Sequence, residues 1–322
     1  MMGSVFQALI PVVTLIVLGF LIVRLRWLRA EGMRDISNVA FLVLAPALLF
    51  RSMATVHLSQ IDFTPVAVYF CAIWVVFAIV MVKHGFNKRA AVLALSTTFS
   101  NTLMIGVPLV SMAYGQEGLV TLFALMSVHS LIMLTMVTSI VEFADAREAN
   151  SSSASPGEGS RIVRLGMTLL KATKATLLHP VPLPILLGLL YSTTGLALPS
   201  ILDQTLQLIG SAFSPIALML VGATLAINRD LGHIRTGLLL ALTKNCIHPL
   251  VMFALGMVVG LKGVGFKVMI LSAALPIGAN VYLYATRYKV AEQEVTASIA
   301  ASTVLALATL SVVMLGIAHL GQ

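Results

Sequence analysis

The chain has 322 residues, of which 59% are hydrophobic and 10% are charged, and its mean hydropathy is +1.01. Because an ordinary soluble domain is about a quarter charged, this composition excludes a soluble globule and indicates a polytopic membrane protein. The net charge of +8 does not point to a nucleic-acid partner, since the basic residues gather in short loops between apolar stretches.

Apolar stretches recur along the whole chain, and each is long enough to cross the ~30 Å hydrocarbon core of a bilayer as a helix. We expect about ten membrane spans on this criterion. They lie at residues 5–27, 36–54, 63–84, 90–113, 117–142, 178–196, 200–227, 235–261, 264–286 and 293–320. No small-residue cleavage site follows the first stretch, so we interpret it as a membrane helix rather than a signal peptide.

The basic residues are distributed unequally between the two sides of the predicted membrane. Loops after odd-numbered spans hold most of the 20 Lys and Arg residues, beginning with Arg24, Arg26, Arg29 and Arg34 in the first loop. By the positive-inside rule these loops are cytoplasmic, and both termini are expected outside.

Residues 143–177 form the longest connection between spans. The connection includes AREANSSSASPGEGS, a stretch too polar and too rich in Ser and Gly to pack, which predicts a flexible linker. Around 161–174, basic residues share one helical face opposite Ile and Leu, which predicts an amphipathic helix on the inner membrane surface. The linker separates residues 1–142 from 178–322. With five spans in each part, we predict two inverted five-helix repeats.

Two spans, one in each half, are interrupted at corresponding points. Each contains a proline, a glycine two residues away and a nearby asparagine: Pro108, Gly106 and Asn101 in the first, and Pro276, Gly278 and Asn280 in the second. Proline removes a backbone donor and clashes with the preceding turn, which is costly in lipid unless the freed groups face a ligand or cavity. Broken helices at matched positions of two repeats therefore indicate the substrate site of a secondary transporter.

The predicted breaks suit an anion. Helix N-termini at the bilayer midplane present unpaired N–H groups and partial positive charge. Asn101, Thr102 and Asn280 add neutral hydrogen-bonding groups, although these side chains could instead serve only to satisfy the exposed backbone of kinked helices. All 12 acidic residues lie at span ends or in loops, which argues against a cation antiporter and fits an anion as cargo.

Lys244 is predicted deep inside its span, where an ionisable group is a functional candidate. Its ammonium could attract the anion or occupy the space of a coupling cation; the alternative is a lysine bonded to backbone carbonyls at a helix crossing. The neighbouring Asn245 could hold it in place. His129 and His248 also lie within spans and could couple transport to protons, or could be packed, hydrogen-bonded histidines.

Three segments carry a family resemblance: SNTLMIGVPLVSMAYG at 100–115, SPIALMLVGATLA at 214–226 and ALPIGANVYLYATRYKV at 274–290. They resemble the auxin efflux carrier family, which includes plant PIN-type carriers and bacterial malonate-transporter-like proteins. The resemblance implies an all-helical fold like that of the bile-acid sodium symporters, with ten spans and with the broken spans 4 and 9 crossed. It also implies a scaffold of spans 1, 2, 6 and 7 and a transport domain of spans 3–5 and 8–10, which moves in an elevator-type cycle.

The resemblance extends to individual residues and to partners. Asn101, Gly106 and Pro108 match the fourth-span motif of the family, and Pro276 and Gly278 match the ninth. Asn280 stands where plant members tend to have an apolar residue. The resemblance further implies an organic anion as cargo, a homodimer formed through the scaffold, and a place in the inner membrane of a bacterium, without the large cytoplasmic loop of the long plant carriers.

We therefore expect a secondary transporter for a small carboxylate, such as malonate or indole acetate. The alternatives are a sodium-coupled organic-anion symporter, or a sensor or channel on the same fold. No H-E-x-x-H, G-x-S-x-G or midplane carboxylate pair is present, so an enzyme is not expected. The two cysteines lie within spans and lack metal-site spacing. We expect no metal, no cofactor and no nucleic-acid partner, and membrane lipid as the surrounding partner.

Overall fold

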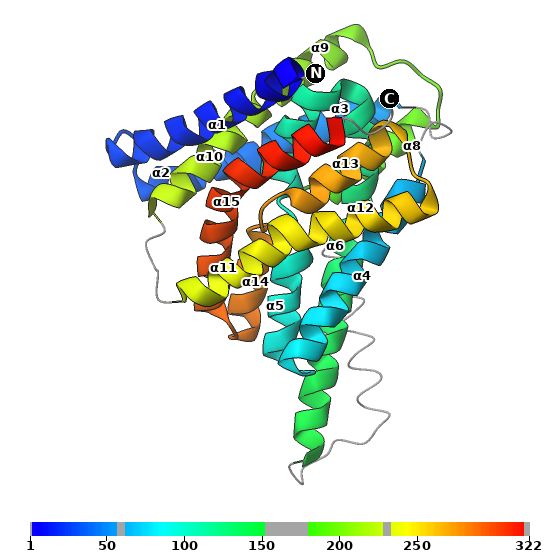
Figure 1. Cartoon of the computed structure of the whole chain (residues 1–322). Coiled ribbons are helices and arrows are strands. Elements are labelled where there is room, and N and C mark those ends of the chain that lie inside the picture. Colours follow the sequence, from blue (N-terminus) through cyan, green and yellow to red (C-terminus); the bar gives the residue numbers. More distant parts are fainter. Residues whose placement is uncertain (1, 57–61, 152–179, 228–232, 319–322) are drawn as a thin grey trace.

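The computed structural model describes residues 2–56, 62–151, 180–227 and 233–318. Every regular element in these ranges is a helix, and an isolated antiparallel bridge joins Ser100 to Ile277. The elements, shown in Figure 1, are α1 (Met2–Arg24), α2 (Ala30–Val39), η1 (Ala40–Leu44), α3 (Ala45–Ala54), α4 (Thr64–His84), α5 (Lys88–Thr98), η3 (Thr102–Gly106), α6 (Val107–Ser151), α8 (Pro182–Ser192), α9 (Ser200–Ser211), α10 (Phe213–Ile227), α11 (Ile234–Leu242), η4 (Thr243–Ile247), α12 (His248–Val259), α13 (Gly263–Ala274), α14 (Asn280–Tyr288) and α15 (Glu292–Ala318).

Within the described ranges, six helical stretches are long and apolar enough to cross a membrane. They are Glu31–Ala54, Thr64–His84, Thr102–His129, Ser200–Ile227, Ile234–Val259 and Glu292–Ala318. Shorter apolar helices cover Leu9–Arg24, Pro182–Ser192 and Gly263–Ala274. An all-helical, polytopic membrane protein is therefore confirmed, whereas the count of ten spans and the inverted repeat stay predictions.

Gly115 divides α6 into two helical segments. Its φ of 58° and ψ of −146° are non-helical, a conformation that glycine adopts without the steric cost of a Cβ. The predicted spans 90–113 and 117–142 meet at this point. The second segment continues to Ser151 instead of ending at 142, so the start of the predicted flexible linker is helical. The predicted amphipathic helix around 161–174 lies outside the described residues.

A π-helical turn precedes a proline at three places in the chain. The turns η1, η3 and η4 end two residues before Pro46, Pro108 and Pro249, respectively. Proline cannot donate a backbone hydrogen bond, and its ring crowds the carbonyl four residues earlier. A single turn of i to i+5 bonding widens the helix and relieves that crowding. Pro46 and Pro249 therefore reshape their helices instead of ending them.

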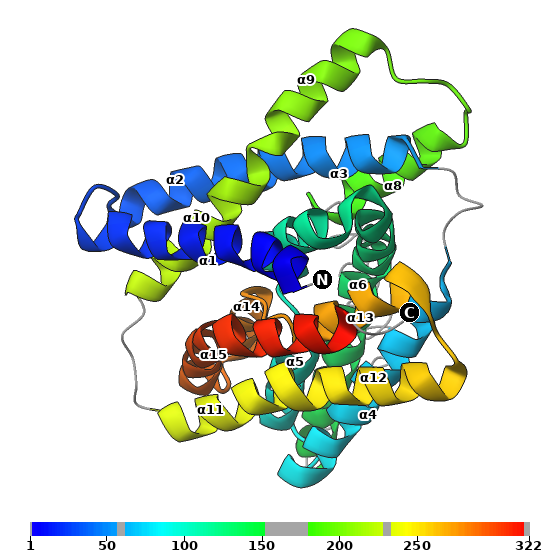
Figure 2. The ribbon, with the colours of Figure 1, turned by 45° about the horizontal axis from the view of Figure 1, so that its top comes forward.

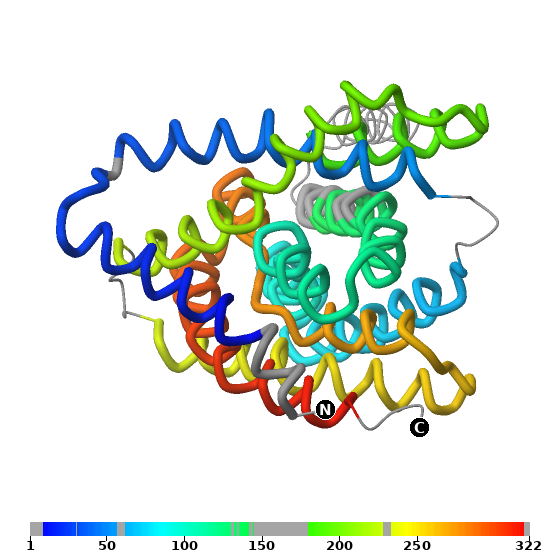
Figure 3. Tube along the Cα trace, turned by 90° about the horizontal axis from the view of Figure 1, so that it is seen from above, coloured from blue at the N-terminus to red at the C-terminus, as the bar shows by residue number. Residues whose placement is uncertain are grey.

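The helices pack in two groups, which Figures 2 and 3 show from different directions. In the first group α1 lies along α10, and α3 packs against α8 and α9. In the second group α11 pairs with α15, and α12 packs against α4 and α13. Because α6 contacts α5 and α13 as well as α1 and α3, it belongs to the second group and borders the first.

Direct backbone contact joins α1 to α10. A Cβ added to Gly19 would come within 1.9 Å of the Met219 carbonyl oxygen, and one added to Gly222 within 1.8 Å of the Ile16 carbonyl oxygen. Small residues permit such close approach, and close packing supplies much of the attraction between helices in lipid. One glycine from each helix therefore fixes this pairing.

Candidate functional site

The two predicted helix breaks are present and bonded to one another. One lies between α5 and η3, and the other between α13 and α14. The Asn101 N–H donates to the Pro276 carbonyl at 2.8 Å, and the Gly278 N–H donates to the Phe99 carbonyl at 2.9 Å. The backbone groups freed by each break thus satisfy those of the other, as a low-dielectric membrane interior requires.

Buried hydroxyl groups complete this junction. The Ser100 hydroxyl donates to the Ser272 carbonyl at 2.7 Å and lies 3.0 Å from the Tyr69 hydroxyl. The Ile277 N–H donates to the Ser302 hydroxyl at 2.9 Å. Sequence analysis did not single out Tyr69, Ser100 or Ser302. Of these three, Tyr69 could have been identified from the sequence, because a tyrosine hydroxyl within an apolar span needs a hydrogen-bond partner.

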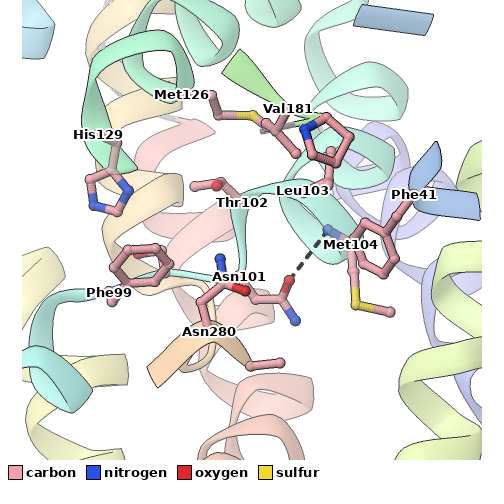
Figure 4. A pocket seen from close by; sticks show the side chains of 14 residues that line it. Phe41, Phe99, Asn101, Thr102, Leu103, Met104, Met126, His129, Val181 and Asn280 are labelled. Atoms are coloured by element: carbon pink, nitrogen blue, oxygen red, sulfur yellow. Dashed lines mark hydrogen bonds between the residues drawn. The ribbon is translucent and has the colours of Figure 1, made fainter. Parts of the chain in front are cut away.

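A cavity of about 250 Å³ lies beside the junction (Figure 4). Polar side chains on its wall are Ser100, Asn101, Thr102, His129 and Asn280. Apolar side chains on its wall include Phe41, Phe99, Met104, Met126 and Val181. Over the described ranges, no Asp, Glu, Lys or Arg is part of this wall. The structure therefore brings together five predicted site residues, namely Asn101, Thr102, His129, Gly278 and Asn280.

Two helices begin at this cavity. Asn101 caps the helix that runs from η3 into α6, and its Oδ1 accepts a hydrogen bond from the Met104 N–H at 3.3 Å, drawn in Figure 4. Helix α14 begins at Asn280 without a side-chain cap. Helix starts carry N–H groups without intrahelical partners and a partial positive charge. With the neutral amides beside them, these starts can bind a carboxylate.

Three predicted site residues shape the breaks without lining the cavity. Pro276 supplies the carbonyl that Asn101 bonds. Gly106 is buried in η3, where an added Cβ would lie 2.8 Å from the Leu275 side chain. Pro108 stands in the first turn of α6, a position at which its missing donor is tolerated.

Lys244 lies outside the cavity wall and is fully buried. Its Nζ donates to the carbonyls of Ala273 and Leu275 at 2.5 and 2.7 Å. These carbonyls belong to the C-terminal end of α13, where a cation complements the helix dipole. This geometry matches the alternative in which Lys244 bonds backbone carbonyls at a helix crossing. A role for Lys244 in attracting the anion or replacing a coupling cation stays a prediction.

Asn245 and His248 also lie outside the wall. The Asn245 side-chain amide donates to the Ser302 carbonyl at 2.7 Å, so it contacts α15. Both ring nitrogens of His248 and the Oδ1 of Asn245 are buried without a hydrogen-bond partner among the residues that the structure describes. The His248 ring packs 5.5 Å from the Tyr69 ring. These side chains thus contact Ser302 and Tyr69 of the junction and are not part of the cavity wall.

Comparisons with known proteins agree with this architecture. A family model described as membrane transport protein matches residues 4–314. The chain is 24% identical over 241 residues to auxin efflux carrier component 8 of Arabidopsis thaliana, covering 65% of this chain and 66% of the plant protein. It is 23% identical over 318 residues to a putative malonate transporter of Rhizobium meliloti, covering 96% and 95%. It is 24% identical over 316 residues to an uncharacterized transporter of Methanothermobacter thermautotrophicus, covering 96% and 97%.

The chain therefore covers just under two thirds of the plant carrier and nearly all of the two prokaryotic relatives. The resemblance predicted from the three motifs is confirmed, and it places the chain among membrane transporters. Since the family model matches almost the whole sequence, the chain belongs to the membrane transport protein family, which includes the auxin efflux carriers.

Proposed function

We propose that this chain is a secondary transporter that binds a small organic anion in the cavity beside the two helix breaks. The observation that carries this proposal is the cavity wall, which has two helix starts and neutral amide and hydroxyl groups but no acidic side chain of the described residues. A volume of about 250 Å³ is below the roughly 300–1,000 Å³ of pockets for drug-sized ligands, which suits a small carboxylate. The names of the relatives, an auxin efflux carrier and a putative malonate transporter, fit the same class of cargo.

Elevator-type alternating access is the mechanism that we propose. The cavity wall combines Phe41 of η1 and Val181 beside α8, from the first helix group, with the breaks and His129 from the second. If one helix group slides along the other, the cavity would therefore open toward one side of the membrane and close toward the opposite side. The first group corresponds to the predicted scaffold of spans 1, 2, 6 and 7, and the second to the predicted transport domain.

We propose that the cavity faces the cytoplasm in this structure. The positive-inside rule places the start of α8 on the cytoplasmic side, and Pro180 and Val181 at that start line the cavity. On the opposite side, the Gln116 side chain donates to the Ser52 carbonyl at 3.4 Å and links α6 to α3. Reporters fused to the C-terminus test this orientation: activity confined to an outside-active reporter agrees with it, and activity of a cytoplasmic reporter contradicts it.

A homodimer formed through the first helix group, in a bacterial inner membrane, is part of the same proposal. Large apolar side chains of this group are exposed in the single chain, including Ile201 and Leu208 of α9. Light scattering of the detergent-solubilised protein measures the mass of the particle. A mass of one chain would remove the dimer from the proposal without affecting the cavity.

Sodium coupling is disfavoured by the position of Lys244. Its Nζ bonds the Ala273 and Leu275 carbonyls, oxygens of the kind that would bind a sodium ion at a helix break. We therefore expect anion binding that is independent of sodium.

Thermal stability of the purified protein tests both parts of this proposal. A ligand that binds the folded state raises the melting temperature, so malonate and indole acetate are each added with sodium or potassium as the cation. Asn101→Ala should abolish the stabilisation. The matched control is Asn87→Ala, which also removes a helix cap, at the start of α5 and outside the cavity. Stabilisation only with sodium favours the symporter alternative, and equal stabilisation of both variants overturns the site. Saturable uptake into vesicles distinguishes a carrier from a channel.

A further inference from the structure

His129 is the one ionisable side chain on the cavity wall, within the residues that the structure describes. It projects from α6, is 2% exposed, and its Nε2 has no hydrogen-bond partner among these residues. Figure 4 shows the ring beside Phe99, with Asn101 and Asn280 farther along the same wall. No described residue therefore competes with a ligand or a proton for this ring nitrogen.

The surroundings of His129 contain no counter-charge. Aromatic rings of Phe99, Tyr69 and Phe70 pack 4.8, 6.0 and 6.0 Å from the imidazole. Beyond this aromatic shell lie His248 of α12 and Lys244 of η4; the Tyr69 hydroxyl is paired with Ser100, and the Lys244 ammonium with two carbonyls. None of these groups supplies negative charge.

The chemistry of a buried imidazole follows from this environment. Moving a charged group into a site of low dielectric is costly unless an opposite charge accompanies it. With the cavity empty, the neutral imidazole is favoured, whereas a bound carboxylate supplies the missing negative charge. Reciprocally, an anion in a cavity without Lys or Arg gains a counter-charge only if His129 takes up a proton.

We propose that His129 binds one proton together with the substrate anion and releases it with the anion, so that transport is proton–anion symport. With a monocarboxylate such as indole acetate the imidazolium and the carboxylate form a neutral pair while the site crosses the membrane, and with malonate the same proton reduces the net charge of the site from −2 to −1. In both cases less unpaired charge is carried through the low-dielectric interior. This inference rests on the proposed function, because it requires a carboxylate in the cavity.

Calorimetric titration of the detergent-purified protein tests the inference, with potassium malonate and potassium indole acetate as the probes. The titration is run in two buffers with different heats of ionisation, so that the difference in binding heat counts the protons taken up. The protein should take up one proton for each anion bound. Above about pH 7 the carboxylates stay ionised, and the affinity should fall about tenfold for each pH unit.

Two variants and a control assign the proton to a residue. His129→Gln should bind the anion weakly, take up no proton and show an affinity that does not change with pH. His84→Gln, at the end of α4 and outside the cavity, should behave as the unmodified protein. His248→Gln tests the buried histidine that packs on Tyr69 outside the cavity wall, and it should retain proton uptake.

The outcomes separate this inference from the proposed function. Binding without proton uptake by the unmodified protein overturns the inference and leaves the anion site intact, whether or not the variants fold. Proton uptake that persists in His129→Gln but is lost in His248→Gln also overturns it. If neither carboxylate binds, the proposed function fails and the inference fails with it.

Discussion

Replacing Gly278 by alanine tests the junction between the two helix breaks. Gly278 donates its N–H to the Phe99 carbonyl at 2.9 Å, and an added Cβ would lie 2.9 Å from the Phe99 ring and 3.1 Å from the Ser100 carbonyl oxygen. Neither neighbour is the free end of a flexible side chain. The two breaks must therefore move apart to accept the methyl group.

The size of the effect follows from these distances. Carbon atoms in favourable contact are at least about 3.5 Å apart, so the ring and the new methyl must separate by roughly 0.6 Å. The same shift lengthens the Gly278–Phe99 hydrogen bond to about 3.5 Å, beyond the useful range. Leaving buried groups unpaired costs about 1–3 kcal/mol, and overpacking costs about 1–3 kcal/mol. We expect a total loss of about 2–6 kcal/mol in the free energy of unfolding, and weaker carboxylate binding.

The assay compares melting temperatures of three glycine variants in detergent, with and without malonate and indole acetate. Gly316→Ala is the matched control, because an added Cβ meets nothing within 4 Å and alanine favours a helix. Gly106→Ala should be intermediate, since the one close contact of its Cβ would be the end of the flexible Leu275 side chain at 2.8 Å, while Thr102 and Asn101 lie at ordinary contact distances of 3.6 and 3.7 Å. If Gly278→Ala melts like Gly316→Ala and keeps its stabilisation by carboxylate, the two breaks do not meet as described.

Three further predictions concern single side chains. Lys244→Met should lower the melting temperature and abolish uptake, because two carbonyls at the end of α13 lose their partner. Lys262→Met, at the N-cap of the same helix, serves as its control and should do neither. Asn101→Ala should remain folded and inserted but lose binding, measured by calorimetry with malonate and indole acetate; unchanged affinity for whichever acid binds would contradict the assigned site. Arg89→Gln breaks an ion pair with Glu294 whose side chains are 48% and 14% exposed, so the melting temperature should reflect a loss of at most about 1 kcal/mol. A larger loss would show that this pair is less screened than its exposure implies.

The sequence was sufficient to locate the breaks and five of the 14 residues of the cavity wall. Proline with nearby glycine and asparagine is a local signal, and Asn101, Gly278 and Asn280 lie where that signal put them. Hydropathy likewise predicted an all-helical membrane protein. These predictions succeeded because each depends on neighbouring residues of one span.

The rest of the wall depends on tertiary packing. Phe41 and Val181 line the cavity although they are distant in sequence from the two breaks. No periodicity distinguishes them from the many other apolar residues of such spans. Lys244 and His129 were both candidates in the sequence, each an ionisable residue within a span, and the sequence favoured a functional role for Lys244 over one for His129. Only the packing separates them, since the backbone carbonyls of α13 hold Lys244 while His129 faces the cavity.

The junction between the two breaks is built from main-chain N–H and C=O groups, which nearly every residue type carries. Apart from the Ser100 hydroxyl, which joins the junction and also lines the cavity, the mechanical connection between the halves of the chain therefore does not depend on the side chains of the cavity wall. Substitutions at Phe41, Met104 or Asn280 can alter the size and polarity of the cavity while the connection persists. A family with this arrangement can acquire new cargoes by a few substitutions, in keeping with relatives that share only 23–24% identity with this chain and carry the names of different substrates.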